Sequence, residues 1–539
     1  MTARVWAALV VSTVALVYLL RLDRVAGLMV DDAWYILLAK ALAGGDGYRL
    51  ISSATDPILP TVPPGFPALL APVFALMPRF PANLFLLKAI SIAAMAGVGL
   101  ATYHYAVRRA PKELATAVAV ATVLTPSLVF LATSTVMPEA VFTLAQILTI
   151  ILLDRGDSDA PADVRRSALA GVLAAVTTLT RTAGVAALAA GLAYLIYRRA
   201  WRSAAVFAAT AMLCLAPWWM YSAAHAPTAE ESARHGGTIA YAYSDLLAMR
   251  RAGAIGAGRA SLAELPARAS RNLVNVLGRE VGGVFVPGFY RGPGESGEET
   301  VGLGGAGASM GSPPAAMVVS FTISALLLVG LATSLRAKPS AGDALVLASA
   351  AMILMLPTRT FRYLLPLAPF LWGYLWSGLR AVTLAAGRLT HRDASPAPAV
   401  MLLSLVGLQL LDHGEYLRTK AQAPAAVSWL ADAQAVDDLM IWMDRNLPPG
   451  APVAATNPGL VYLRTGRKAV VATAPAASWR EWQSAGIRFI VALQPAALPP
   501  RSLGFKTLYQ SSRLWVVEIP SPDRTARHFT AHRASLDNY

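Results

Sequence analysis

Charged residues are scarce in this sequence. Only 14% of its 539 residues are Asp, Glu, Lys or Arg, whereas 56% are hydrophobic and the mean hydropathy is +0.51. An average soluble domain has roughly 25% charged residues. A chain with so little charge cannot cover a large core with a hydrated surface, so the composition excludes a purely soluble protein and indicates that lipid forms part of the solvent.

Cysteine is almost absent as well. The single copy, Cys214, lies within an apolar stretch, which excludes an intrachain disulfide and a cysteine metal cage. The net charge of +15 would suit a nucleic-acid partner, but the sequence has no zinc-ligand spacing. The basic residues flank apolar runs, as in membrane proteins, and we therefore expect no nucleic-acid partner.

The apolar runs are numerous. Arg4 and the run that ends at Leu20 resemble the start of a signal peptide. No small-x-small cleavage site follows and many further runs do, so we interpret this segment as a retained first span. Taking about 20 mostly apolar residues per span, we expect about eleven spans, with the count open by one pair around Arg181. They lie near residues 4–21, 84–107, 113–132, 138–153, 167–180, 183–198, 203–222, 315–335, 343–357, 363–386 and 397–412.

Basic residues mark one side of these spans. With the N-terminus inside, every inside segment carries at least one Arg or Lys, and the opposite orientation would place all of them outside. The positive-inside rule therefore predicts a multi-pass protein of the cell (inner or plasma) membrane, with its N-terminus inside and its C-terminus outside. The inside segments are marked by Arg4; Arg108, Arg109 and Lys112; Arg155, Arg165 and Arg166; Arg198, Arg199 and Arg202; Arg336 and Lys338; and Arg388 and Arg392.

Three long segments then face the outer side: the loops 22–83 and 223–314, and the chain from about residue 425. The last segment shows a helix pattern, a Pro-Pro-Gly turn and five short apolar stretches (PVAAT, KAVVA, IRFIVAL, FKTLY and LWVVEI). This alternation predicts a small α/β domain. We divide the chain into a polytopic α-helical membrane domain (1–424), an extracytoplasmic α/β domain (425–522) and a tail (523–539).

The first outer loop carries an acidic pair, Asp31 and Asp32, directly after the first span. We expect a helix from residue 32 or 33 to about 43, ended by a Gly-Gly pair. One interpretation makes Asp31 the N-cap and Asp32 an acid favoured by the helix dipole. The other makes one carboxylate a general base at the lipid–water boundary.

At this point the chain resembles a known group, the GT-C superfamily of membrane glycosyltransferases. Its nearer relatives are the protein O-mannosyltransferases and the lipid A aminoarabinose transferases. The resemblance covers nearly the whole chain and rests on the order of its motifs. These are DDAWY at 31–35, PPGFPALL at 63–70, STVMPEAVF at 134–142, LTRTAG at 179–184 and RTFRYLLPLAPF at 359–370, before an outer C-terminal domain.

The resemblance implies an enzyme that moves a sugar from a polyprenyl-phosphate-linked donor to an acceptor at the outer face, with inversion. The acceptor would be a protein, a lipid or a glycan. Asp31 is then the expected base and Asp32 its substitute, because an attacking hydroxyl must lose a proton. The leaving lipid phosphate needs cations rather than a general acid. Tyr35, Glu139 and Tyr363 are the expected supporting residues, although an acid at a helix start, like Glu139, is also explained by the helix dipole.

The expected phosphate ligands are Arg181, Arg359, Arg362 and, more weakly, Lys40, which could equally be a surface lysine. The three arginines fall at outer ends of spans. The alternative for the arginines is a side chain that reaches the lipid headgroups without any ligand. The aminoarabinose transferases carry a phosphate-binding lysine just before the paired prolines, but this chain has Val62 there. The phosphate must then be held differently.

No cofactor is indicated. A divalent metal site is conceivable where the second outer loop brings His225 and His235 near Glu230 and Glu231, but the cluster is loose and we expect no metal. Two other functions stay open. A transporter or flippase of a polyprenyl-linked substrate would also bury charges at membrane depth. A non-catalytic envelope assembly or receptor protein would bind its partners through the C-terminal domain.

Overall fold

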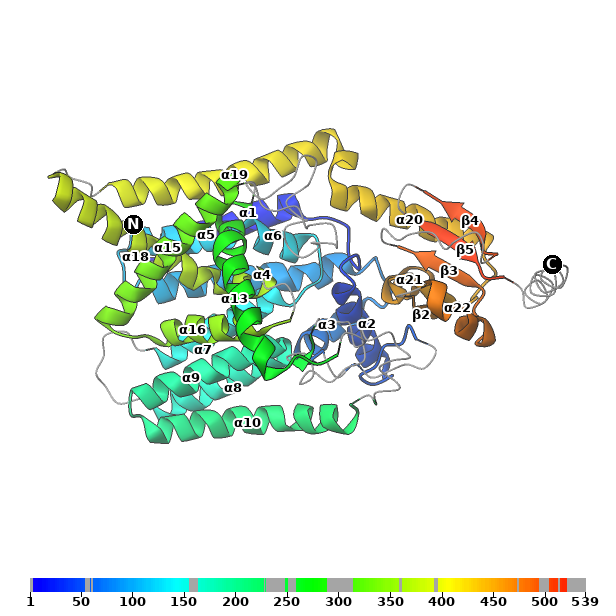
Figure 1. Ribbon diagram of the computed structural model, residues 1–539, viewed down its shortest axis with the longest axis horizontal. Helices are drawn as coiled ribbons and strands as arrows, with labels where there is room; N and C mark the ends of the chain where they lie inside the picture. Colours follow the sequence, from blue (N-terminus) through cyan, green and yellow to red (C-terminus); the bar gives the residue numbers. More distant parts are fainter. Residues whose placement is uncertain are drawn as a thin grey trace, which may run out of the picture.

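The computed structural model is a bundle of long helices with a small mixed sheet at one end (Figure 1). Each of the eleven predicted apolar segments coincides with a helix or with consecutive helices. The structure describes residues 3–53, 59, 62–154, 163–226, 228, 248–250, 258–287, 314–357, 361–391, 396–472, 475–493, 504–511 and 514–520. The bundle contains α1 (Ala3–Arg21), α4 (Leu84–Ala106), α5 (Lys112–Leu124), α6 (Pro126–Thr133), α7 (Glu139–Leu153), α8 (Val164–Thr180), α9 (Val185–Tyr197), α10 (Trp201–Ala224), α15 (Pro314–Ala337), α16 (Ala341–Met355), α18 (Ala368–Thr390) and α19 (Ala397–Gln422).

The lengths of these helices differ. Among the described residues, five helices are long and apolar enough to cross a membrane alone, namely α1, α4, α10, α15 and α19. The α5–α6 pair, bent by 52°, gives a sixth. The bend falls at Pro126, whose ring disfavours helical backbone at the preceding residue. Further apolar helices such as α7 and α16 are shorter, so the total of eleven spans and their sidedness stay predictions.

The outer surface of the bundle is apolar. Leu16, Leu213, Val318 and Leu411 each leave more than half of their surface exposed, at 64%, 76%, 65% and 69%. They lie on four of the long helices. Apolar side chains exposed along several helices mark a surface that water does not solvate well. Together with the helix lengths, this surface identifies a multi-pass membrane protein.

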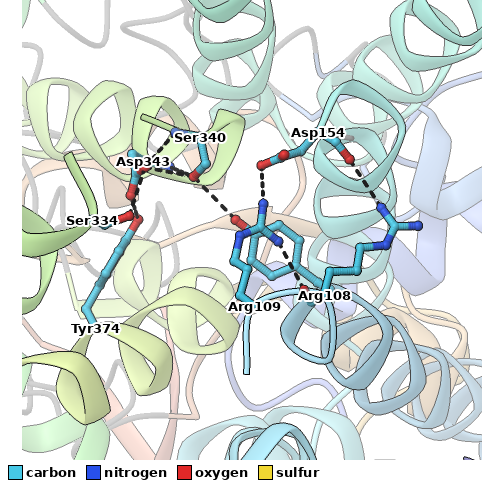
Figure 2. Close-up of polar contacts among 8 residues, drawn as sticks. Arg108, Arg109, Asp154, Ser334, Ser340, Asp343 and Tyr374 are labelled. Carbon is cyan, nitrogen blue, oxygen red and sulfur yellow. Dashed lines mark hydrogen bonds and ion pairs between the residues drawn. The ribbon is translucent and has the colours of Figure 1, made fainter. Parts of the chain in front are cut away.

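Buried polar contacts tie the helices together at the end of the bundle predicted to be cytoplasmic (Figure 2). Asp343 lies in the first turn of α16 and accepts hydrogen bonds from the Ser340 backbone N–H at 2.7 Å and from the Tyr374 hydroxyl at 2.6 Å. Nearby, the Arg109 guanidinium lies 2.5 Å from the carboxylate of Asp154. Both carboxylates are buried. One contact joins α16 to α18, and the other joins the chain after α4 to the end of α7.

The C-terminal domain confirms the predicted helix and all five predicted strands. Strand β1 pairs parallel with β2 and β3, and β5 pairs antiparallel with β3 and β4. The sheet order is β2-β1-β3-β5-β4. The elements are η8 (Pro424–Ala426), α20 (Ser428–Asn446), β1 (Val453–Ala455), α21 (Pro458–Thr465), β2 (Ala469–Val471), α22 (Pro475–Ser484), β3 (Phe489–Ala492), β4 (Lys506–Gln510) and β5 (Trp515–Glu518).

The remaining elements are shorter. They are α2 (Asp31–Gly44) and α3 (Gly65–Leu76) in the first outer loop, η1 (Thr182–Gly184), and η3 (Leu262–Glu264), α13 (Leu265–Asn275), η4 (Val276–Glu280) and α14 (Val281–Phe285) in the second loop, with α17 (Phe361–Leu364) and η7 (Leu365–Leu367) before α18. Asn272 of α13 donates to the carbonyls of Ile353, Leu354 and Leu356. These carbonyls end α16 and would otherwise lack helical partners, so the second loop is docked on the bundle.

Candidate functional site

The two acids of the pair occupy different environments. Asp32 is completely buried, and its carboxylate accepts backbone N–H groups of Gly27 at 2.6 Å, Met29 at 3.1 Å and Ala33 at 3.0 Å. Burial raises the pKa of Asp32 to about 6, with the hydrogen bond from Gly27 opposing the rise and the charge of Asp31 adding to it. Asp32 therefore shapes the turn that leads into α2.

Asp31 faces outward. Its side chain is 41% exposed, and its Oδ2 atom accepts a hydrogen bond from Nη1 of Arg362 at 3.1 Å. The helix begins at Asp31 itself, one or two residues earlier than predicted, and Val30 occupies the N-cap position. The interpretation of Asp31 as the N-cap is therefore wrong, because its carboxylate points at an arginine rather than at the first N–H groups. The predicted Gly-Gly end is confirmed, with Gly45 at φ 79° as C-cap.

Glu139 joins the two arginines. Its Oε1 atom accepts hydrogen bonds from Nη1 of Arg181 at 2.8 Å and from Nη2 and Nε of Arg362 at 2.8 and 3.1 Å. The Glu139 side chain is fully buried, while those of Arg181 and Arg362 are 12% and 18% exposed. Glu139 thus has more than a helix-dipole role, because it neutralises two guanidinium groups that lie below the surface.

The resulting cluster contains Asp31, Glu139, Arg181 and Arg362 and carries no net charge when all four groups are ionised. Arg362 commits three of its nitrogens to the two carboxylates. Arg181 commits one nitrogen to Glu139, and its guanidinium lies 4.6 Å from the ring centre of Tyr363, a cation–π contact. Within the described part of the chain, Arg181 is therefore the cation with more donors left for a ligand.

A small cavity adjoins this cluster. It lies among α7, η1, α16, α17 and η7. Arg181 and Tyr363 contribute its polar edge together with Gln146 and Ser349. The remaining lining residues are Phe142, Ala183, Met352, Pro366 and Leu367.

The PPGFPALL motif positions Tyr35 beside the cluster. A side chain at Gly65 would place its Cβ 2.7 Å from the Leu179 carbonyl oxygen, so only glycine lets α3 approach the end of α8 this closely. Phe66 then packs edge-on against Tyr35, with ring centres 5.3 Å apart. Burial raises the pKa of the Tyr35 phenol, and the charge of Asp31 raises it further. Tyr35 therefore keeps its proton at neutral pH and can donate a hydrogen bond.

One of the predicted phosphate ligands, Lys40, is not in the cluster. Lys40 lies 5.2 Å from the ring centre of Tyr462, against the C-terminal domain. Arg359 lies outside the described residues. Val62, at the position of the family lysine, is buried, and its carbonyl accepts the Tyr48 hydroxyl at 2.5 Å.

One buried lysine, Lys88, is not among the residues predicted from the sequence. Lys88 of α4 is fully buried and donates to the carbonyls of Asp23 at 2.6 Å and Thr133 at 2.8 Å. The Asp23 carboxylate in turn lies 2.7 Å from Lys420 of α19. A lysine within an apolar run is costly and therefore a signal in itself. Here it anchors the start of the first outer loop.

The described residues contain no group of three His, Cys, Asp or Glu that could hold a metal ion. His225 lies at the end of α10, and its Nδ1 atom is 2.8 Å from the carbonyl oxygen of Tyr221. The other members of the suggested cluster, Glu230, Glu231 and His235, lie outside the described residues.

The helical bundle with its docked loop has the kind of fold that the resemblance to the GT-C glycosyltransferases predicts. The sequence itself matches no family model and no curated protein. The fold is similar to that of ArnT from Cupriavidus metallidurans bound to undecaprenyl phosphate, with a TM-score of 0.56 and 13% identity over 97% of this chain and 99% of that one. It is also similar to the Archaeoglobus fulgidus oligosaccharyltransferase tethered with an acceptor peptide, with a TM-score of 0.54 and 12% identity over 91% of this chain and 69% of that one.

Proposed function

We propose that the protein is a membrane glycosyltransferase that moves a sugar from a polyprenyl-phosphate donor to an acceptor hydroxyl at the outer face, with inversion. The observation that carries the proposal is the contact between Asp31 and Arg362 at 3.1 Å. It fixes an accessible carboxylate beside two arginines, which is what proton removal and phosphate binding require together. The undecaprenyl phosphate bound by the similar ArnT structure supports a lipid phosphate as the ligand.

Asp31 suits the role of base. It is the most exposed of the four charged side chains, and its Oδ1 atom contacts no donor in the described part of the chain. Arg362 holds the other oxygen and so limits the rotation of the carboxylate. An acceptor hydroxyl that approaches Oδ1 can pass its proton to Asp31 as its oxygen bonds to the anomeric carbon. The lipid phosphate then leaves with the electron pair of the broken bond.

Among the described residues of the cluster and its neighbour Asp32, Asp31 is the accessible carboxylate, and this supports inversion. A retaining transfer needs a second carboxylate as nucleophile, about 5 Å from the first. Asp32 is buried behind the turn, and Glu139 is buried between the two arginines. Neither can reach an anomeric carbon without leaving its partners. A single displacement with Asp31 as base is the reaction that fits.

The arginines suit the leaving group. A phosphate that enters beside Arg181 meets a planar guanidinium able to grip two oxygens at once. Arg362 supplies a second positive charge next to it. The site is partly shielded from water, so these charges stabilise a leaving phosphate more than they would in solution.

The experiment is a transfer assay with the purified full-length chain in nanodiscs. Radiolabelled undecaprenyl-phosphate sugars with hexose and pentose headgroups are offered together with membrane lipid, glycan and peptide acceptors. We expect the label to move to an acceptor and Asp31→Asn to lower the transfer rate by about 100-fold or more, the usual scale for the loss of a general base.

A matched control is Asp46→Asn in the same loop. This variant makes the same chemical change at an exposed residue away from the cluster. Its transfer rate should equal that of the parent. If neither Asp31→Asn nor Asp32→Asn slows transfer, the acidic pair is not the base. Movement of the intact labelled lipid across the bilayer without transfer would support a flippase instead.

A further inference from the structure

The C-terminal domain contacts α2, the helix that carries the acidic pair. Its helix α21 packs against α2, where a Cβ added at Gly459 would lie 3.1 Å from Leu37. The backbone N–H of Ala469 donates to the carbonyl of Ser52 at 2.8 Å. The ammonium of Lys468 donates to the carbonyl of Ile51 at 2.7 Å. The domain therefore meets both α2 and the chain that follows it.

The side chain of Asn457 extends these contacts to the acidic pair. Asn457 is 1% exposed, and its Oδ1 atom accepts the backbone N–H of Leu460 at 3.1 Å, which caps α21. Its Nδ2 atom donates to the carbonyl of Gly27 at 2.7 Å. The N–H of the same glycine donates to Asp32 at 2.6 Å. A continuous chain of hydrogen bonds thus runs from the C-terminal domain to the carboxylate that neighbours Asp31.

The turn held by these bonds is strained. Val30 has φ 60°, a left-handed backbone that is unfavourable for a β-branched residue. Such a conformation persists only where the surroundings fix it from several sides. Asp32 holds the turn through the N–H groups of Gly27 and Met29. Asn457 holds the opposite face of Gly27, which itself has φ 91° and lies against Leu460.

We infer that Asn457 is a positioning residue for Asp31, so that the C-terminal domain sets the geometry of the base. Val30 directly precedes Asp31, and relaxation of its backbone would turn the first residue of α2 away from Arg362. This inference rests on the proposed function, because it assigns the aim of Asp31 to another domain. Asn457 touches neither substrate nor any residue of the acid–arginine cluster.

The test is Asn457→Ser in the full-length chain. Serine keeps an oxygen that can cap α21 but is too short to reach Gly27. We expect the turnover number for the undecaprenyl-phosphate sugar used by the parent to fall about 10- to 100-fold, since a displacement near 1 Å is enough for such a loss. The affinity for undecaprenyl phosphate should stay unchanged, because Arg181 and Arg362 lie on other elements.

Hydrogen exchange provides the second measurement. Amides of residues 27–38 should exchange faster in Asn457→Ser, while amides of β1 and β3 keep the parent rates. The control is Asn446→Ser, in which an exposed asparagine of the same domain loses a bond within its own helix. If Asn457→Ser does not fold, Asn457→Asp keeps the cap for Leu460 and removes the donor to Gly27.

The outcomes distinguish a failure of the positioning role of Asn457 from a failure of the proposed function. Unchanged turnover and unchanged exchange of residues 27–38 would overturn the positioning role of Asn457. A fall in turnover together with faster exchange throughout the sheet would also overturn it, because the domain would simply be less stable. If Asp31→Asn is inactive while Asn457→Ser is fully active, the inference fails and the proposed function stands. If Asp31→Asn is fully active, the proposed function itself fails.

Discussion

The guanidinium of Arg362 lies 3.1 Å from the carboxylate of Asp31, although 331 positions separate the two residues in the chain. The same guanidinium also binds Glu139, which is fully buried. Arg362 therefore connects an exposed acid on the first outer loop with a buried acid at the start of α7. This connection gives the Asp31 carboxylate a fixed direction.

The first prediction concerns Asp32, whose pKa is raised from 3.8 to about 6 by burial. An acid with a raised pKa in the folded state stabilises the fold below its unfolded pKa, and this contribution is lost as the pH rises through the folded pKa. At roughly 1.4 kcal/mol per pH unit, it amounts to about 3 kcal/mol. Asparagine does not titrate, so Asp32→Asn should be more destabilising at pH 4 than at pH 7.

The measurement is the unfolding temperature of the parent and of Asp32→Asn between pH 4 and pH 7.5 in one detergent. The difference between the two proteins isolates Asp32 from all other titrating groups. Asp46→Asn, in the same loop, should show no such pH dependence. A constant difference between the parent and Asp32→Asn across the range would contradict the raised pKa.

The second prediction concerns Glu139. Replacing it with glutamine leaves Arg181 and Arg362 without the charge that neutralises them, and breaking a buried pair costs about 3–5 kcal/mol of unfolding free energy. The same change raises the net charge of the cluster by one. Glu139→Gln should therefore lower the unfolding temperature while the affinity for undecaprenyl phosphate is kept or increased.

The control for this variant is Glu264→Gln, which removes an ion pair to Arg250 between exposed side chains. Water solvates both groups there, so stability should hardly change. A large loss of lipid-phosphate affinity in Glu139→Gln, with stability intact, would show that the carboxylate itself takes part in binding.

Much of the fold could be predicted from local patterns. The strands at PVAAT and LWVVEI alternate or concentrate apolar residues over a few positions, and the structure has β1 and β5 there. The Gly-Gly pair ends α2 because Gly45 takes the left-handed C-cap conformation, which favours glycine. Such signals depend on neighbouring residues, so a single sequence contains them.

The site depends on contacts between distant segments and was only partly predictable. The sequence predicts the individual members of the cluster, which are Asp31, Glu139, Arg181 and Arg362. No local pattern predicts that Glu139 contacts both arginines. Lys40 follows Asp31 by nine residues on the same helix, yet its ammonium group lies over the ring of Tyr462. The different environments of Asp31 and Asp32 arise from the turn at Val30, and sequence patterns do not reveal a strained backbone.

The third prediction concerns the sidedness of the membrane domain, which rests on the basic residues. Reporter fusions after Arg109, Arg166, Arg202 and Arg392 should report the cytoplasm, because positive residues are retained on that side. Fusions near Gly288 and at the C-terminus should report the outer face. A cytoplasmic C-terminus would contradict the topology and would place the acid–arginine cluster on the wrong side for the proposed reaction.

The last prediction distinguishes a phosphate site from an arginine that merely reaches the lipid headgroups. Arg181→Lys and Arg362→Lys keep the charge but lose the planar fork that binds two oxygens. We expect each to weaken undecaprenyl phosphate binding about 10-fold or more, because one charge-assisted hydrogen bond contributes about 1.5–3 kcal/mol. Alanine variants should bind more weakly still, and Arg359→Lys extends the test to the third candidate.

The control is Arg49→Lys. Arg49 is an exposed arginine of the first outer loop, and this variant should bind like the parent. For a residue that only reaches the headgroups, lysine would substitute freely because charge and length suffice there. Parent-like affinity in every lysine and alanine variant, measured in one nanodisc preparation, would exclude all three arginines as phosphate ligands and leave Lys40 as the remaining candidate.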